Sequence, residues 1–341
     1  MIVICWWQLP IYAARCIGAF VKQTTEDIVV FRVQTSRFPI RGAAEMTGTR
    51  VIDVAEDETR TLAEILGETP STIVCGGWHP AIYWTWLKEV KRAGGRSIFC
   101  TDEPYRGRGL KEWIRNIRFQ VCFRRWIDYV FVAGEGGRKK FVDFYKIPAN
   151  RVVSGVYSGD PELFYDGEPL CNRAKKFVYV GHYDENKNVI ALCKAFAQTK
   201  NQDWSLELYG GGPLAETLKQ YESERIKVNG YINADQLGEV YRSARCFVLG
   251  SFSEQWGVVV HEACMCGCLL LLSDRVGARF DFATLENAAL FNPASVDDLR
   301  NAFEAIMAKT NEEFELGREC SLTLGKAFTP TQFAERLSSI I

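Results

Sequence analysis

Short apolar runs alternate with segments of helical periodicity along the whole chain. In the first half, runs typical of buried strands are IVICWW, DIVVFRV, RVIDV, STIVCGG, RSIFCTD and YVFVAGE. The second half repeats the pattern with KFVYVGH, SLELYGG, IKVNGY, CFVLGS and CLLLLSD. Helix-like segments such as residues 80–94 and 188–199 separate many of these runs. Continuous apolar strands between helices predict parallel sheets covered on both faces, and two such series predict two doubly wound α/β domains.

The join between the two series falls at residues 154–176, which are rich in Gly, Pro and Asp. We therefore expect an N-terminal domain at residues 1–165 and a second domain at residues 166–328. Residues 329–341 open with Thr-Pro and are amphipathic, which predicts a C-terminal helix. Packing of this helix back on the first domain is one option.

Length and charge narrow the class of protein. The 341 residues are too many for one ordinary core and fit two domains. A formal net charge of -1 gives no global field that would attract nucleic acid. The sequence contains no run of about 18 apolar residues, so no membrane span is predicted. The apolar N-terminus lacks the basic region and cleavage site of a signal peptide and is interpreted as a strand, so we expect a cytoplasmic protein.

Twelve cysteines are scattered along the chain, most of them inside apolar runs. Buried free thiols in a reducing compartment are the expected state. Cys264, Cys266 and Cys268 do not have the C-x-x-C spacing of a zinc site. No D-x-D pair is placed to hold a divalent ion either. We therefore predict neither a metal nor another cofactor.

Two glutamates bracket an apolar helix start in the second half. Glu254 lies in the loop after the strand CFVLGS, three residues before Gly257, where we expect the helix to begin. The first amides of that helix form an anion site, and Gly257 allows a ligand to approach them. Glu262 leans back toward this turn. Carboxylates on either side of a phosphate can accept hydrogen bonds from hydroxyl groups, which suggests a nucleotide sugar as the ligand. The alternative is that Glu254 caps the helix and Glu262 is a solvated helix residue.

Two neighbouring strand ends add weaker signals. Lys187 stands in the loop after KFVYVGH, where an ammonium can neutralise a diphosphate, although a solvated lysine has the same pattern. Residues 210–212 are all glycine and precede a Pro that starts a helix, a weak nucleotide signal. The backbone of residues 228–231 is expected near the same edge of the second sheet, at the carboxyl ends of its strands.

The combined order of these motifs is more specific than any one of them. A strand with G-x5-K-N is followed by L-x3-G-x-G-P and then by S-x-S-E-x7-E. This order resembles the second domain of the retaining GT-B glycosyltransferases, in particular family 4, over residues 177–278. The resemblance implies two Rossmann-like domains facing across a cleft. It also implies a UDP- or GDP-sugar donor and transfer with retention to a glycan or polyprenyl-linked acceptor, in capsule, O-antigen or exopolysaccharide synthesis.

The resemblance also assigns roles in the donor site. It implies that Glu254 binds the donor sugar, Glu262 the ribose and Lys187 the diphosphate. Amides of Gly257 and Val258 are expected to face sugar or phosphate.

Four further positions complete the expected donor side: Gly181, His182, Gly211 and Tyr231. His182 stands where the family usually has Arg, and an imidazole is a weaker diphosphate partner than a guanidinium.

The first half is less diagnostic. Its first loop lacks the Gly-Gly pair common in the family. TDEP resembles the family's HEP segment, which places Asp102 beside the transferred sugar and, with Glu254 and Lys187, among the expected catalytic residues. A helix cap is the alternative for Asp102. His79, with Trp78 beside it in GGWHP, is the competing candidate on the acceptor side.

Residues 107–127 combine an apolar and a basic face. The apolar positions share one helix face, which is predicted to be core: Leu110, Trp113, Ile114, Ile117 and Val121. Four basic positions lie on another face, bordered by Phe119 and Trp126: Arg108, Lys111, Arg115 and Arg118. A basic face edged by aromatics suits peripheral contact with an anionic membrane; a solvated face is the alternative.

Two rival functions stay open at this point. One is a sugar-nucleotide epimerase or phosphorylase of the same architecture, acting without a glycan acceptor. The other is a catalytically silent GT-B-like subunit that binds a partner transferase. The substituted His182 and the missing glycines of the first loop favour the second rival, whereas Glu254, Lys187 and Glu262 argue against it.

Overall fold

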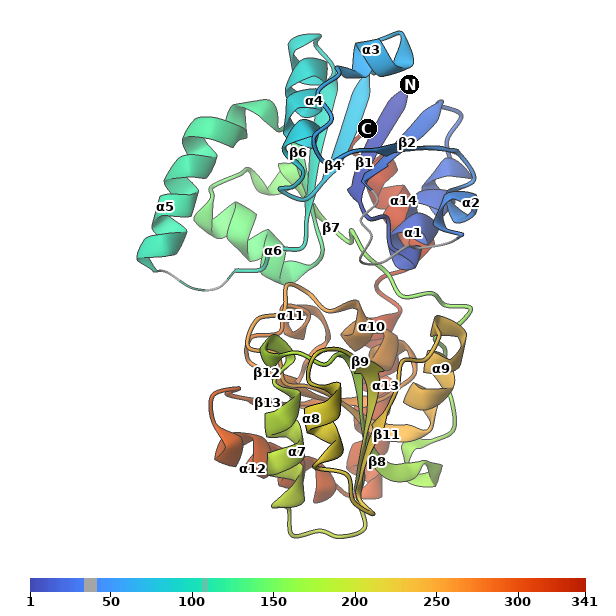
Figure 1. Cartoon of the computed structure of the whole chain (residues 1–341), viewed down its shortest axis with the longest axis vertical. Helices are drawn as coiled ribbons and strands as arrows, with labels where there is room; N and C mark the ends of the chain where they lie inside the picture. The colour runs from blue at the N-terminus through green and yellow to red at the C-terminus, as the bar shows by residue number, and fades with distance from the viewer. Residues whose placement is uncertain (34–41, 106, 108) are drawn as a thin grey trace. The chain divides into compact units, whose positions relative to one another are not determined.

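The computed structural model describes residues 1–33, 42–105, 107 and 109–341 and contains two compact units (Figure 1). The first comprises Met1–Ser158 together with Phe328–Ile341, and the second comprises Gly159–Ala327. The chain therefore leaves the first unit, completes the second and returns to the first with its last residues.

A parallel seven-stranded sheet forms the centre of the first unit, in the order β3-β2-β1-β4-β5-β6-β7. The order reverses beside β1, the signature of a doubly wound fold. The strands are β1 (Ile2–Trp7), β2 (Ile28–Val33), β3 (Arg50–Val54), β4 (Thr72–Gly76), β5 (Arg96–Thr101), β6 (Tyr129–Val132) and β7 (Val152–Ser154).

Helices cover both faces of this sheet. They are α1 (Ile11–Val21), α2 (Ala43–Thr47), α3 (Leu62–Leu66), α4 (Ala81–Arg92), α5 (Leu110–Arg118), α6 (Glu135–Lys139) and α14 (Pro330–Ser338). Short helical turns of other kinds are the π-helices η1 (Phe119–Phe123) and η3 (Lys140–Phe144) and the 3₁₀ turns η2 (Arg124–Trp126) and η4 (Ala149–Arg151).

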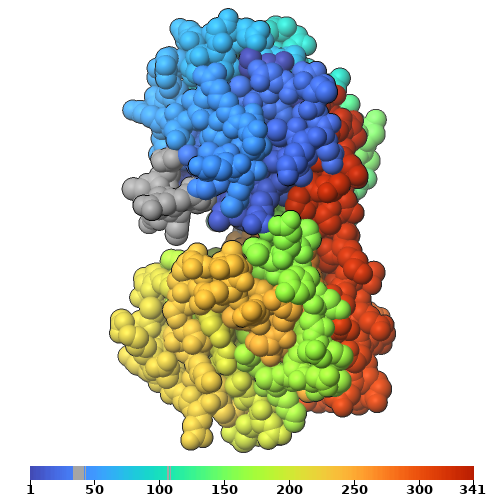
Figure 2. Space-filling model, turned by 90° about the vertical axis from the view of Figure 1, so that its right-hand side faces the viewer, coloured from blue at the N-terminus to red at the C-terminus, as the bar shows by residue number. Residues whose placement is uncertain are grey.

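The last helix belongs to the core of the first unit. Phe333 and Leu337 of α14 are buried in the same apolar cluster as Ile4 of β1 and Ile17 of α1. The Phe333 ring lies 5.3 Å from that of Phe131. In space-filling view the C-terminal segment, in red, lies beside N-terminal residues, in blue (Figure 2).

The second unit repeats the design with six parallel strands in the order β10-β9-β8-β11-β12-β13. The strands are β8 (Ala174–His182), β9 (Ser205–Gly211), β10 (Ile226–Asn229), β11 (Ala244–Leu249), β12 (Leu269–Ser273) and β13 (Ala288–Phe291). The order reverses between β8 and β11. Ligands of such sheets bind outside the strand ends at that switch point.

Nine helical segments surround this second sheet. They are η5 (Leu170–Asn172), η6 (Glu185–Lys187), α7 (Val189–Ala197), α8 (Ala215–Lys219), α9 (Ala234–Arg242), α10 (Val258–Met265), α11 (Arg279–Phe282), α12 (Val296–Met307) and α13 (Asn311–Gly325). Both faces of the sheet are covered, and β12 is accordingly buried along its whole length. Its uniform run of leucines explains why the strand was visible in the sequence.

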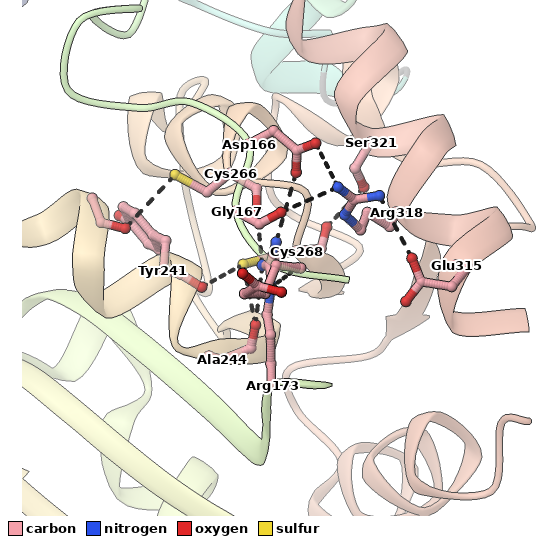
Figure 3. Close-up of polar contacts among 12 residues, drawn as sticks. Asp166, Gly167, Arg173, Tyr241, Ala244, Cys266, Cys268, Glu315, Arg318 and Ser321 are labelled. Atoms are coloured by element: carbon pink, nitrogen blue, oxygen red, sulfur yellow. Dashed lines mark hydrogen bonds and ion pairs between the residues drawn. The ribbon is translucent and has the colours of Figure 1, made fainter. Parts of the chain in front are cut away.

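A buried arginine fixes the carboxyl end of α10 (Figure 3). Arg173 donates to the carbonyl of Cys266 at 2.9 Å and to that of Glu168 at 2.7 Å. Asp166 pairs with both Arg173 and Arg318. Because a guanidinium satisfies a carbonyl at the helix end, α10 is held firmly at the end away from its N-terminus.

Most of the cysteines are buried and serve as packing residues. All twelve are free thiols, and Cys264, Cys266 and Cys268 are buried. Burial raises the pKa of the Cys268 thiol to about 11, so it is protonated at neutral pH. Among the described residues, no group of three or more His, Cys, Asp or Glu side chains is arranged to hold a metal ion. In the same part of the chain, no helix is long and apolar enough to cross a bilayer.

One prediction about packing is wrong. The apolar positions of residues 110–121 do not face the core: Leu110 is 73% exposed and Val121 68%. The buried positions of this segment are Glu112 and Phe119. Periodicity showed which residues share a face, but the opposite face is the covered one. Arg108, which was assigned to the basic face, lies outside the described residues.

Candidate functional site

The loops after β8 and β11 flank the switch point of the second sheet. After β8, the Asp184 side chain accepts a hydrogen bond from the Lys187 amide at 2.9 Å and so caps η6. Asn188 follows with a left-handed φ of 58°, a conformation that Asn tolerates well, and starts α7. This tight turn fixes the backbone from which the Lys187 side chain projects.

Lys187 and Glu254 form an ion pair across the switch point. Lys187 belongs to the loop after β8 and Glu254 to the loop after β11, 67 residues further along. The Ser251 hydroxyl donates to the same carboxylate oxygen of Glu254 at 3.0 Å. The side chains of Lys187 and Glu254 are only 21% and 15% exposed, so the charges are shielded from water but accessible to a ligand.

A second loop braces the Glu254 backbone. Glu254 forms an isolated parallel bridge with Val276, and the Gly277 amide donates to the Glu254 carbonyl at 3.2 Å. A Cβ at Gly277 would lie 1.7 Å from the Gln255 carbonyl oxygen. Only glycine therefore fits at position 277 of the segment SDRVGA, and the backbone position of Glu254 depends on Gly277.

Helix α10 begins directly beside this ion pair. Gly257 is its N-cap with a left-handed φ of 96°, and a Cβ there would meet Glu254 Cγ at 3.2 Å. Val258 is the first helical residue. The first amides of a helix have no partner within it and carry its positive dipole end, which suits a phosphate.

Glu262 lies one turn into α10, on the side of Val258. The buried Tyr241 hydroxyl donates to Glu262 Oε2 at 3.1 Å. Burial raises the pKa of the Glu262 carboxyl to about 7, and the hydrogen bond from Tyr241 opposes only part of this shift. Near neutral pH this carboxyl is thus present in both its protonated and its ionised form.

His261 holds α10 from the opposite side. Its Nδ1 accepts from the Gly159 amide at 2.9 Å, so the neutral ring carries its proton on Nε2 and donates to the Gly325 carbonyl at 2.8 Å. The ring stacks on Phe282 at 5.0 Å. Burial lowers the pKa of His261 to about 4, so it is neutral and structural at physiological pH.

Close packing of β8 against β9 explains part of the glycine signal. A Cβ at Gly210 would lie 1.9 Å from the Gly181 carbonyl oxygen, whereas one at Gly211 would meet nothing within 4 Å. Gly211 is therefore the glycine of this turn that leaves room for a ligand. His182 ends β8 with its side chain 48% exposed and its Nδ1 3.2 Å from Asp184.

Tyr231 lies further from this centre in the sheet order. It follows β10, the edge strand that is separated from β8 by β9. Its side chain is 80% exposed. The structure thus brings Lys187, Glu254 and the start of α10 together and leaves Tyr231 at the sheet edge.

The first-unit candidates lie at the ends of β4 and β5. Asp102 follows β5, and its negative charge adds to the burial that raises the pKa of Tyr157. The Trp78 indole stacks on Trp84 at 5.5 Å and donates to a Glu103 oxygen at 3.2 Å, so it is part of an aromatic core. His79, by contrast, is exposed.

Comparison with known proteins now gives the family of the second unit. Residues 167–319 match the family of glycosyl transferases group 1. The second unit is a group 1 glycosyltransferase domain. Two O-antigen biosynthesis glycosyltransferases of Escherichia coli, WbnH and the probable WbiN, are each 26% identical over 258 residues, which is 73% of this chain. The match spans 65% of each relative's length, slightly under two thirds.

Solved structures show the fold of the whole chain. Anabaena HepE in complex with UDP superimposes with a TM-score of 0.77 at 13% identity, covering 99% of this chain and 98% of HepE. Sucrose-phosphate synthase from Thermosynechococcus elongatus gives 0.71 at 17% identity, covering 99% and 97%. Together with the two parallel sheets, these similarities show that the chain has the GT-B fold.

Three partners in the group 1 domain were missing from the sequence interpretation. Ser251 and Tyr241 hydrogen-bond the two glutamates, and Gly277 braces the Glu254 loop. Ser251 stands three residues before Glu254, a spacing at which a hydroxyl often reaches the later side chain. Tyr241 had no comparable signal, because the fold alone brings α9 beside α10.

Proposed function

We propose that this protein is a retaining glycosyltransferase that moves a sugar from a nucleotide-diphosphate donor to a glycan or polyprenyl-linked acceptor. The observation that carries the proposal is the Lys187–Glu254 ion pair beside the start of α10. A cation, a carboxylate and helix amides together match a ligand that carries both phosphate and hydroxyl groups. The group 1 domain and its two O-antigen relatives support the same activity.

Each site residue then has a distinct task. The α10 amides and the Lys187 ammonium bind the diphosphate and stabilise charge on the leaving phosphate. Glu262, as carboxylate, accepts hydrogen bonds from the ribose hydroxyls. Glu254 leaves its pairing with Lys187 in part and accepts a hydroxyl of the transferred sugar. His182 and Gly211 line the diphosphate side, with Gly181 behind them.

No protein nucleophile is needed for this chemistry. In this mechanism the acceptor hydroxyl attacks the sugar on the same face from which the phosphate leaves. The leaving phosphate takes the proton of that hydroxyl while the bond between the sugar and the phosphate breaks. The protein supplies positioning and charge stabilisation, which the helix amides and Lys187 provide. Asp102 is our candidate for contact with the acceptor hydroxyl, and His79 is the competing one.

The acceptor and setting are inferred from the relatives. Both E. coli proteins are named for O-antigen biosynthesis, which favours assembly of a bacterial surface polysaccharide in the cytoplasm. UDP-sugars are the first donors to test, because the structurally similar HepE was solved with UDP and with UDP-glucose.

A donor panel tests the site. Melting temperatures are measured with UDP, GDP, ADP and their common sugars, for wild type and Glu262→Ala, because a ligand that binds only the folded state raises the melting temperature. We expect one nucleotide family to stabilise wild type and the shift to shrink in the variant. Glu239→Ala, an exposed glutamate on α9, is the matched control and keeps the shift.

Three outcomes argue against the proposal. If no nucleotide changes the melting temperature of wild type, the donor site is wrong. If a nucleotide sugar binds but no candidate acceptor becomes glycosylated and the protein co-purifies with another transferase, it is the silent subunit. Release of free or epimerised sugar without an acceptor would instead identify an epimerase or phosphorylase.

A further inference from the structure

The surface of the first unit carries an apolar stripe on one helix. It runs along α5 and into η1, and its five members are 43% to 73% exposed: Leu110, Trp113, Ile114, Ile117 and Val121. Their spacing of three or four residues places them on one side of the helix. In Figure 1, α5 stands at the outer edge of the first unit. A contiguous exposed apolar patch of this kind marks an interaction surface.

The opposite side of the same helix is polar, and the protein binds it. Asn116 and Gln120 donate to the carbonyls of Phe144 and Tyr145 at 3.3 Å and 2.6 Å. Glu112 is buried and lies 3.4 Å from the ammonium of Lys140, which is itself fully buried. The helix therefore faces the protein with hydrogen-bonding groups and is fixed with its apolar side outward.

Lys140 also ties the helix to the loop after β5. Its Nζ lies 2.6 Å from Glu103, and it shares Glu112 with the Arg115 guanidinium. Rotating α5 to bury its apolar side would move Glu112 away from the buried Lys140 ammonium and leave Glu103 as its only carboxylate partner among the described residues, which is unfavourable for a buried charge. The outward orientation of the stripe is thus enforced by charge.

The charge beside the stripe has one sign. Residues 110–126 contain five basic residues and a single acid, Glu112, which is buried and paired. Lys111 and Arg118 are exposed and flank the stripe. Since the whole chain has a net charge of -1, this is a local concentration of positive charge.

We propose that α5 docks on an anionic phospholipid surface, lying flat with its apolar stripe among the acyl chains and its cations at the head groups. An exposed apolar stripe, a tryptophan and flanking cations on one helix are the features that bind a helix to a lipid interface. The stripe is narrow and about 17 Å long at 1.5 Å per residue. This proposal goes beyond transferase activity and does not depend on it, although it would bring the protein to a lipid-linked acceptor.

Vesicle co-sedimentation tests the proposal on the full chain. The vesicles are phosphatidylcholine with or without phosphatidylglycerol, and the variant Trp113→Ser/Ile117→Ser removes two large apolar side chains. We expect wild type to bind the anionic vesicles and the variant to bind at least about tenfold more weakly. The matched control is Leu285→Ser/Leu316→Ser, which removes two exposed leucines of the second unit and keeps wild-type binding.

A charge variant tests the second half of the argument. Lys111→Gln/Arg118→Gln is expected to weaken binding to anionic vesicles by about tenfold and to leave weak binding to pure phosphatidylcholine unchanged. Added salt should weaken wild type more than this variant. Melting temperatures with and without UDP show whether each variant is folded and keeps its donor site, so failure of the donor proposal is scored separately.

Two results would overturn the proposal. Wild type that stays in the supernatant with anionic vesicles has no lipid-binding surface. Dimers in light scattering that dissociate in Trp113→Ser/Ile117→Ser, without vesicle binding by wild type, would show that a second copy of the chain covers the stripe.

Discussion

At the residue scale, the proposed role of Glu262 predicts that donor binding depends on pH. Its carboxyl has a pKa of about 7 because it is buried, and only the charged form accepts hydrogen bonds from two ribose hydroxyls. We expect donor affinity to fall as pH drops below about 7, approaching tenfold per pH unit. Calorimetric titration of the nucleotide between about pH 8 and about pH 6 measures this slope.

Substitution separates this effect from other titrating groups. Glu262→Gln cannot ionise, so it should bind weakly with a flat pH profile, whereas Glu239→Gln should keep the wild-type slope. A steep slope that survives in Glu262→Gln would assign the dependence to another group. Without ligand, the pKa of Glu262 is raised from 4.5 in the unfolded chain to about 7 in the fold. The contribution of this group to the free energy of unfolding is therefore fully present below pH 4.5 and is lost as pH rises through about 7.

Lys187 gives a second prediction at this scale. Lys187→Met keeps the length of the side chain and removes the charge that would face the diphosphate. A charge-assisted hydrogen bond contributes about 1.5–3 kcal/mol, so nucleotide-diphosphate binding should weaken by about ten- to hundredfold. Lys194→Met, on the exposed side of α7, is the matched control. Equal affinity of the two variants in the same titration would remove Lys187 from the site.

At the element scale, α10 depends on His261. His261→Phe preserves an aromatic ring against Phe282 but loses both backbone hydrogen bonds, which should lower the free energy of unfolding by about 2–4 kcal/mol. The folded-state pKa of about 4 lies below the ordinary value of 6.5, so the wild-type stabilisation is present above pH 6.5 and lost as pH falls through 4. Urea unfolding at several pH values measures both effects.

The exposed His79 provides the control for this prediction. His79→Phe should unfold like wild type at each pH, whereas His261→Phe should lose the part of the acid sensitivity that belongs to His261. If both variants retain the same acid sensitivity, the buried imidazole is not its source.

Elements also show where sequence patterns succeed and where they fail. The strand, loop and helix around Glu254 were predictable because an apolar strand, a Gly and a helical repeat each have local causes. The helix at residues 110–118 was also predicted, but its orientation was wrong. Periodicity groups Leu110, Trp113 and Ile117 on one face; which face is covered depends on the buried Lys140, distant in sequence.

At the scale of the whole molecule, two parallel sheets followed from two series of apolar runs. The role of Tyr241 and the discontinuity of the first unit did not follow, because both depend on contacts between residues far apart in the chain. No sequence signal singled out His261; the fold places it between Gly159 and Gly325. Local signals therefore predicted the charged groups of the candidate site, and tertiary contacts determine their environment.

The discontinuous first unit leads to a prediction about its last helix. Leu337 of α14 is fully buried in the cluster that includes Ile4 and Phe131. Leu337→Ala removes buried apolar volume and should lower the free energy of unfolding of the first unit by about 2–5 kcal/mol. Seven of the nine tryptophans belong to that unit, so tryptophan fluorescence during urea unfolding reports mainly on it.

Glu335→Ala, two residues away on the exposed side of α14, tests whether burial is the cause. It should leave the fluorescence transition within about 0.5 kcal/mol of wild type. The proposed donor site belongs to the second unit, so the nucleotide-dependent shift of that unit should survive in both variants. If Leu337→Ala left the tryptophan transition unchanged, α14 would not be part of the first core, and the first unit would be stable without the returning chain.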